Sequence, residues 1–62
     1  MKLKELREEN IVSQKEIAEF LNIKQNTYSQ YETGKRQLPI DLLIKIAKFY
    51  KVSTDYILGL ED

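Results

Sequence analysis

The chain has 62 residues, which is enough for one domain with a small core. It contains no cysteine and no histidine, so disulfides, Cys/His zinc sites and thiol or imidazole catalysis are excluded. Ten basic side chains balance ten acidic ones, and a net charge of zero argues against the strongly basic domain typical of nucleic-acid binders. The apolar runs are too short for a signal peptide or a membrane span. We therefore expect a single cytoplasmic domain over residues 1–62 that is not an enzyme and binds no metal or cofactor.

The first part of the chain has the spacing of two helices. Leu3 and Leu6 lie three residues apart among charged residues in "LKELREEN", as on one face of a helix. In "SQKEIAEFLN", Ser13 and Glu16 have the S-x-x-E spacing of a capping box, which predicts a helix start. Asn22 then interrupts the pattern, and asparagine tolerates the left-handed backbone conformation better than most residues. The second helix is therefore expected to end there.

Three more helices are predicted in the rest of the chain. The segment "KQNTYSQYETGKR" stops at Gly34, and glycine is common just after the end of a helix. Pro39 begins "PIDLLIKIAKFYK", and Ser53 is expected to cap a last short helix that ends at Gly59. The expected core stripe of the fourth helix is Leu43, Ile46, Ala47 and Tyr50. No segment alternates long enough to predict a strand, so the predicted fold is all-α, a compact domain of five helices.

The second and third predicted helices lie close together in the sequence. The second ends near Leu21 and the third begins near Gln25, which leaves a turn of three or four residues. That spacing suits a helix-turn-helix, whose second helix can lie in the major groove of DNA. Many small helical proteins contain such turns, so the spacing alone is a weak indication.

The third predicted helix has an unusual exposed face. At about 100° per residue, Tyr28 and Tyr31 share one face and are expected to point inward. The opposite face carries amides and hydroxyls: Asn26, Ser29, Gln30 and Thr33, with Gln25 at its edge. Glutamine and asparagine can form two hydrogen bonds with adenine, and serine or threonine can bond several base edges. An ordinary solvated helix face is the alternative, and the geometry alone does not exclude it.

The segment "SQKEIAEFLNIKQNTYSQYETGKRQLP" resembles the phage-repressor helix-turn-helix family, the lambda-repressor-like proteins of Cro/Xre type. The matching positions are Ser13, Gln14, Ile17, Ala18, Leu21, Thr27, Glu32, Gly34 and Pro39. The resemblance continues through "LLIKIAKFYKVSTDYILG", which is similar to the family's fourth and fifth helices, and so covers nearly the whole chain. It implies a sequence-specific transcriptional regulator, a repressor, that binds a pseudo-palindromic operator in double-stranded DNA as a dimer through the major groove.

Carried over residue by residue, the resemblance implies two sets of DNA contacts. Base edges would be contacted by Gln25, Asn26, Ser29 and Gln30, with Gln25 and Gln30 as the main readers. Phosphates would be contacted by Gln14, Lys24, Thr27, Lys35 and Arg36. For Lys35 and Arg36 the alternative is an ordinary solvated loop.

The chain departs from the family pattern at three positions. Asn22 stands where glycine is common. Lys24 replaces the usual Ser or Thr cap of the recognition helix, which loses about 1 kcal/mol of capping but adds a cation close to the DNA backbone. Tyr28 replaces the usual Ile or Val, and its hydroxyl is expected to reach the surface or a polar partner.

Arg7 and Glu32 resemble a pair that forms a salt bridge across the domain in some repressors of this family. The residue pattern agrees, because Glu32 falls on the inner side of its helix and a buried carboxylate needs a partner. If both side chains are instead partly exposed, the pair contributes about 0–1 kcal/mol. We expect Glu32→Ala to destabilise the fold by well over about 1 kcal/mol.

The chain has more apolar residues than one buried face requires. Beyond its core stripe, the fourth helix carries Ile40, Leu42, Ile44 and Phe49, and Phe20 is a further case. The candidates for a homodimer surface are Ile40, Ile44, Tyr56, Ile57 and Leu60. The alternative is that these residues dock onto a domain outside this chain, which is either a complete small repressor or the N-terminal fragment of a larger one.

The main rival to a DNA-binding function is a protein-interaction module, such as an antitoxin or an anti-repressor partner. Zero net charge favours this rival, whereas the amide-rich helix face and the two basic residues Lys35 and Arg36 favour DNA. No small-molecule site is evident from the sequence.

Overall fold

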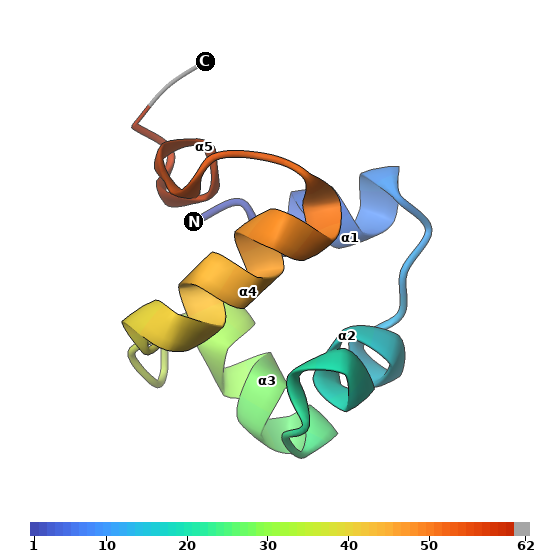
Figure 1. The fold of residues 1–62 in the computed structure, drawn as a ribbon. Coiled ribbons are helices and arrows are strands. Elements are labelled where there is room, and N and C mark those ends of the chain that lie inside the picture. The colour runs from blue at the N-terminus through green and yellow to red at the C-terminus, as the bar shows by residue number, and fades with distance from the viewer. Residues whose placement is uncertain (61–62) are drawn as a thin grey trace.

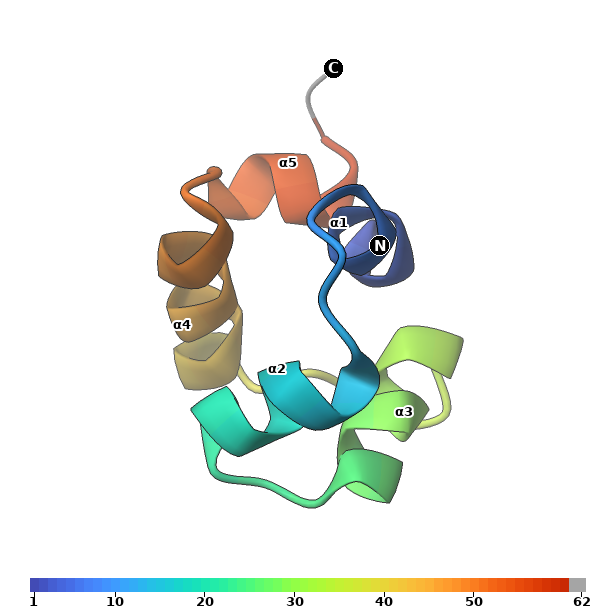
Figure 2. The ribbon, with the colours of Figure 1, turned by 90° about the vertical axis from the view of Figure 1, so that its right-hand side faces the viewer.

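The computed structural model describes residues 1–60 and contains five α-helices (Figure 1). They are α1 (Leu3–Glu9), α2 (Gln14–Leu21), α3 (Gln25–Thr33), α4 (Ile40–Tyr50) and α5 (Thr54–Leu58). No strand occurs in the described part of the chain, so the predicted all-α fold is confirmed. Figure 2 shows α2 and α3 packed together at one end, α1 and α5 at the other, and α4 running along one side.

Local backbone and capping features set the start of α2 and the C-terminal ends of α2, α3 and α4. The Ser13 hydroxyl accepts the Glu16 N–H at 3.0 Å and the Glu16 carboxylate accepts the Ser13 N–H at 3.1 Å, so the predicted capping box is formed. Asn22, with φ of 59°, ends α2 in the left-handed conformation, and Gly34, with φ of 79°, ends α3. Lys51 ends α4 with φ of 59°, although lysine gives no sequence signal for this conformation.

The short helix α5 is held by contacts at both ends and in its middle. The Ser53 hydroxyl accepts the Tyr56 N–H at 3.0 Å, and Gly59 ends the helix with φ of 81°. The Lys2 N–H donates to the Ile57 carbonyl at 2.8 Å, which ties the start of the chain to α5. The Ile57 side chain is fully buried. Its assignment to a dimer surface was therefore wrong, because the side chain completes the core of the protomer.

The core fills the space between the helices. Its largest fully enclosed side chains are Leu3, Ile17, Tyr28, Ile46 and Ile57. The predicted stripe of α4 is confirmed: Leu43, Ile46 and Ala47 are buried and Tyr50 is half-buried. Leu42 is buried as well, so it is a core residue and not a surplus apolar one. Among residues 1–60, no helix has the length and apolar character needed to cross a bilayer.

Candidate nucleic-acid interface

The turn over residues 22–24 fixes how α3 leaves α2. The Ile23 N–H donates to the Ala18 carbonyl at 3.0 Å, and the Ile23 side chain packs against the core. Lys24 is the N-cap of α3, and its side chain makes no capping hydrogen bond. The expected loss of a capping hydroxyl is therefore confirmed, and the first N–H groups of α3 keep no side-chain acceptor.

The two faces of α3 differ as the periodicity predicted. Tyr28 and Tyr31 are buried. Gln25 and Asn26 are exposed, and Thr27, Ser29 and Gln30 are partly exposed. Together with Gln14 of α2, the side chains of Gln25, Asn26 and Ser29 line a shallow hollow on the surface. The structure thus brings three of the four predicted base-contacting residues next to one predicted phosphate-contacting residue.

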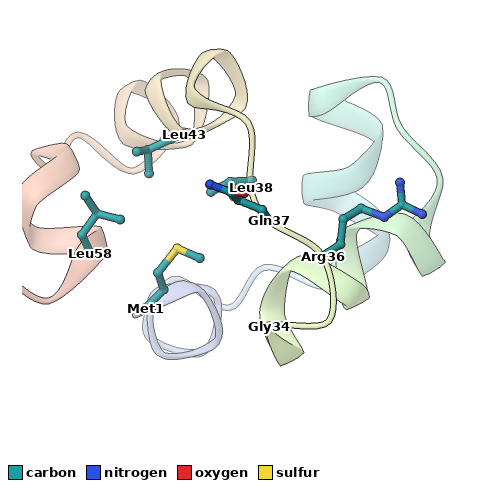
Figure 3. Close-up of a pocket in the computed structure, with 7 residues that line it drawn as sticks. All are labelled: Met1, Gly34, Arg36, Gln37, Leu38, Leu43 and Leu58. Atoms are coloured by element: carbon teal, nitrogen blue, oxygen red, sulfur yellow. The ribbon is translucent and has the colours of Figure 1, made fainter.

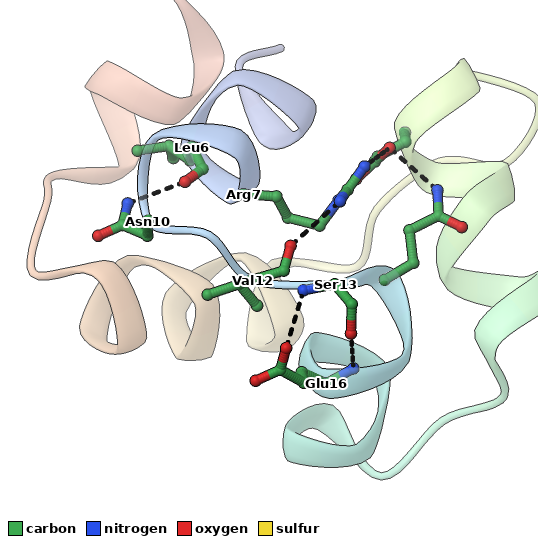
Figure 4. Close-up of polar contacts among 8 residues, drawn as sticks. Leu6, Arg7, Asn10, Val12, Ser13 and Glu16 are labelled. Atoms are coloured by element: carbon green, nitrogen blue, oxygen red, sulfur yellow. Dashed lines mark hydrogen bonds and ion pairs between the residues drawn. The ribbon is translucent and has the colours of Figure 1, made fainter.

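Beneath this face, Arg7 and Glu32 form the predicted ion pair. Arg7 Nε donates to Glu32 Oε2, and Arg7 Nη2 donates to Glu32 Oε1 at 3.2 Å. The two side chains keep only 14% and 6% of their surface exposed, respectively. Arg7 Nη1 also donates to the Val12 carbonyl at 3.1 Å, which holds the loop between α1 and α2 (Figure 4). The pair therefore connects α1, α3 and this loop. Both residues keep a small exposed fraction, so the structure lies between a fully buried pair and the partly exposed pair of the alternative.

Burial and hydrogen bonding act in opposite directions on the Glu32 carboxyl. Burial raises its pKa, but the hydrogen bonds from Arg7 and Gln14 and the nearby Tyr28 hydroxyl outweigh that effect, so the pKa lies below its ordinary value of 4.5. The Glu32 hydrogen bond likewise raises the pKa of Arg7. Both partners, the Glu32 carboxylate and the Arg7 guanidinium, are thus held in their charged forms.

The hydroxyl of Tyr28 was expected to reach the surface or a polar partner, and it is enclosed instead of reaching the surface. Tyr28 has none of its surface exposed, and its hydroxyl meets no well-aligned acceptor among the described residues. Burial is the main cause that raises the pKa of Tyr28, and the nearby Glu32 carboxylate raises it further. Burial also raises the pKa of Tyr50 to about 12. The core beneath α3 therefore contains phenols that stay neutral.

The side chain of Gln14 takes part in the same network. Gln14 Nε2 donates to Glu32 Oε1 at 3.1 Å, a bond that the sequence did not indicate. One amide N–H and the amide oxygen remain for contacts outside the protomer. Its predicted phosphate contact stays a prediction, and the bond to Glu32 fixes where that contact would lie.

The loop after α3 carries the two basic residues of the predicted phosphate set, and Lys35 and Arg36 are both exposed. Arg36 Nε donates to Gln30 Oε1 at 2.8 Å, which brings a predicted phosphate-contacting residue to a predicted base-contacting one. The sequence contained no signal for this pair, because its six-residue separation spans a helix end whose path depends on Gly34.

The remaining dimer candidates lie on the surface to different degrees. Ile40 and Leu60 are 73% and 74% exposed, and Ile44 is 44% exposed. Tyr56 is half-buried, and Lys2 Nζ lies 4.7 Å above the centre of its ring. These four residues stay candidates for a dimer surface.

Two further apolar features lie outside the α3 face. A groove of about 430 Å³ runs between the α3–α4 loop and α5, with Met1, Leu38, Leu43 and Leu58 as its apolar lining (Figure 3). The exposed rings of Phe20 in α2 and Phe49 in α4 pack together, with 4.6 Å between their centres. No group of three His, Cys, Asp or Glu residues within residues 1–60 has the arrangement of a metal site.

Comparison with known proteins supports the resemblance seen in the sequence. A family model described as helix-turn-helix matches residues 3–57. No solved structure matches the chain.

Several curated proteins are similar over most of the chain. The HTH-type transcriptional regulator ImmR of Bacillus subtilis is 46% identical over 98% of this chain and 48% of its own length. The uncharacterised HTH-type transcriptional regulator YobD of Bacillus subtilis is 38% identical over 98% of this chain and 54% of its own length. The cryptic phage CTXphi transcriptional repressor RstR of Vibrio cholerae is 37% identical over 82% of this chain and 46% of its own length. The chain spans about half the length of these relatives.

Proposed function

The chain belongs to the helix-turn-helix family of DNA-binding transcriptional regulators of Cro/Xre type, and we propose that it reads a repressor operator through the outer face of α3. In this proposal α3 lies in the major groove, and Gln25, Asn26, Ser29 and Gln30 contact base edges. The operator is pseudo-palindromic and is bound by two copies of the chain.

One observation carries this proposal. Gln25, Asn26 and Ser29 are open to solvent on one side of α3, and their side chains make no hydrogen bond within residues 1–60. These residue types are poorer helix formers than Glu, Lys or Arg, so a solvated face gains nothing from them. Their amides and hydroxyls do match the donor and acceptor pattern of base edges.

Phosphate contacts would frame this face on both sides. Gln14 and Lys24 lie at its α2 end, and Lys35 and Arg36 lie in the loop beyond its other end. With three cations per protomer in this set, a dimer would release few counterions. We expect a slope of about −5 for log K against log salt, which is shallow for a repressor dimer.

Dimer binding follows from the size of the reading surface. A single recognition helix contacts only a few base pairs, and two-fold dimers place two such helices about 34 Å apart. Ile40, Ile44, Tyr56 and Leu60 are the residues on which we place the dimer contact. Exposed apolar side chains are also common on monomers, so exposure alone does not identify a dimer contact. Variants at these positions test the contact through the dimer dissociation constant.

A protein-interaction function is the second candidate, and the exposed Phe20–Phe49 pair favours it. The two rings lie on α2 and α4, whereas the proposed DNA contacts are on α3 and its flanks. A partner bound there would leave the α3 face unused or free for DNA.

Selection from random duplex DNA at about physiological salt, followed by sequencing, tests the proposal. We expect an inverted repeat with half-sites about one helical turn apart. Enrichment of no sequence by the folded protein would contradict a DNA-reading function of this chain and favour the protein-interaction alternative.

A further inference from the structure

Arg36 is attached to Gln30 by two hydrogen bonds. Its backbone N–H donates to the Gln30 carbonyl at 3.2 Å, and its Nε donates to Gln30 Oε1 at 2.8 Å. The loop that begins at Gly34 therefore returns along α3. Figure 3 shows the guanidinium of Arg36 extending away from the other residues that line the groove. The side chain of Arg36 thus lies beside a predicted base reader instead of projecting freely from the loop.

The pair fixes which way the Gln30 amide faces. A guanidinium has only donors, so the Gln30 atom that meets Arg36 Nε must be the amide oxygen. The amide NH₂ group then faces away from Nε. Arg36 also keeps N–H groups that Gln30 does not use. The two side chains together present several donors, and one of the two lone pairs of the Gln30 oxygen already accepts a hydrogen bond from a cation.

We propose that Arg36 is a positioning residue for Gln30 and that the pair selects guanine at one position of each half-site. This inference rests on the proposed DNA-reading function. Guanine offers two acceptors in the major groove, N7 and O6, which match a surface of donors. Adenine keeps the N7 acceptor but has an amino donor in place of O6, which a surface made mainly of donors matches less well, and the Gln30 oxygen that could accept this donor already accepts from Arg36. Arg36 therefore determines specificity, beyond adding a positive charge near the phosphates.

The neighbouring Lys35 provides a matched control. It lies in the same exposed loop and carries the same charge, but its side chain makes no hydrogen bond within the described residues. Lys35→Ala and Arg36→Ala therefore remove equal charge, and only Arg36→Ala frees the Gln30 amide. A phosphate contact affects all sequences alike, whereas a positioning residue affects one base position.

The first test needs no DNA. Side-chain ¹⁵N relaxation of the Gln30 amide, measured by NMR on the free 62-residue protein, reports whether this group is held. We expect an ordered Gln30 amide in the parent protein and in Lys35→Ala, and a mobile one in Arg36→Ala. A Gln30 amide that is equally mobile in all three proteins would overturn the pairing while leaving the proposed function intact.

The second test uses selected DNA sites. Gln30→Ala identifies the half-site position that Gln30 reads, and we expect guanine there with the parent protein. Arg36→Ala should reduce the preference for guanine at that position by about 5-fold to about 150-fold and shift it toward adenine. Lys35→Ala should weaken binding to all sites without changing that position. The double variant Gln30→Ala/Arg36→Ala should show the same base preference at that position as Gln30→Ala alone, because Arg36 acts there only through Gln30.

The opposite results distinguish failure of the Arg36 positioning role from failure of the proposed DNA-reading function. If Arg36→Ala weakens all sites uniformly, as Lys35→Ala does, the positioning role is wrong and the DNA-reading function stands. If the parent protein prefers adenine at the Gln30 position, the guanine assignment is wrong. If no sequence is enriched by the parent protein, the proposed function itself fails.

Discussion

The two sides of α3 differ in how their side chains use their hydrogen-bonding groups. On the inner side, Tyr28 and Tyr31 are buried and Glu32 accepts hydrogen bonds from Arg7 and Gln14. On the outer side, Gln25 and Asn26 are exposed, and their side chains form no hydrogen bond within residues 1–60. One helix thus contains side chains whose hydrogen bonds are used to hold the fold and side chains whose hydrogen bonds are left available. The contrast indicates that stability and recognition can be changed separately on this helix.

The largest expected effect is on the inner side. Glu32→Ala leaves the largely buried guanidinium of Arg7 without its carboxylate and removes the acceptor of Gln14. We expect the free energy of unfolding to fall by about 2–4 kcal/mol, measured by urea unfolding. Gln25→Ala serves as the outer-side control and should change it by less than about 0.5 kcal/mol. If Glu32→Ala lowers the unfolding free energy by less than about 0.5 kcal/mol, the inner side of α3 contributes no more to stability than the outer side.

Acid should reproduce part of the same effect. The folded-state pKa of Glu32 lies below its ordinary value of 4.5, so the stability it contributes is present above that pH. This stability is lost as the pH falls below about 4.5 and through the lower pKa of the folded protein. Glu32→Gln should therefore flatten the fall in unfolding free energy below pH 4.5. If the parent protein and Glu32→Gln lose stability in parallel, the carboxylate is not a stabilising group.

On the outer side, the expected effect is on DNA alone. Gln25→Ala should lose about 1–3 kcal/mol of discrimination at one base position of each half-site. Competition binding between the selected site and single-base variants measures this loss. Equal losses on every variant would mean that Gln25 contributes general affinity and reads no base.

The smallest expected effect lies where the two sides meet, at the start of α3. Lys24→Ser should supply the missing side-chain cap and raise the unfolding free energy by about 0.5–1 kcal/mol. It should also make the salt dependence of DNA binding shallower by about one phosphate contact per protomer. Lys24→Ala is the control that removes the charge without adding a cap. Lower stability in Lys24→Ser than in Lys24→Ala would show that the hydroxyl does not cap α3.

The sequence was sufficient to predict features that depend on near neighbours. The capping box of Ser13 and Glu16, the turn at Asn22 and the inward face of Tyr28 and Tyr31 all follow from spacing within one helix or turn. The Arg7–Glu32 pair was also predicted, because the family resemblance supplied a partner that lies 25 residues away in the sequence.

The features that sequence reasoning missed depend on how distant elements meet. Ile57 is buried because α5 packs against the start of the chain, where Lys2 bonds to its carbonyl. Gln14 bonds to Glu32 only because the α2–α3 turn brings the two side chains together. Arg36 reaches Gln30 only because the loop after Gly34 turns back along the helix. Each of these contacts satisfies a polar group or fills space in a way that residue spacing does not specify.

The most direct test of the central claim is to repeat the DNA selection with Gln25→Ala/Asn26→Ala after confirming that its urea unfolding matches the parent protein. We predict that the base preferences at the positions next to these residues disappear while the spacing of the two half-sites is kept. Recovery of the same sites with the same preferences would contradict the claim that the outer face of α3 reads the operator.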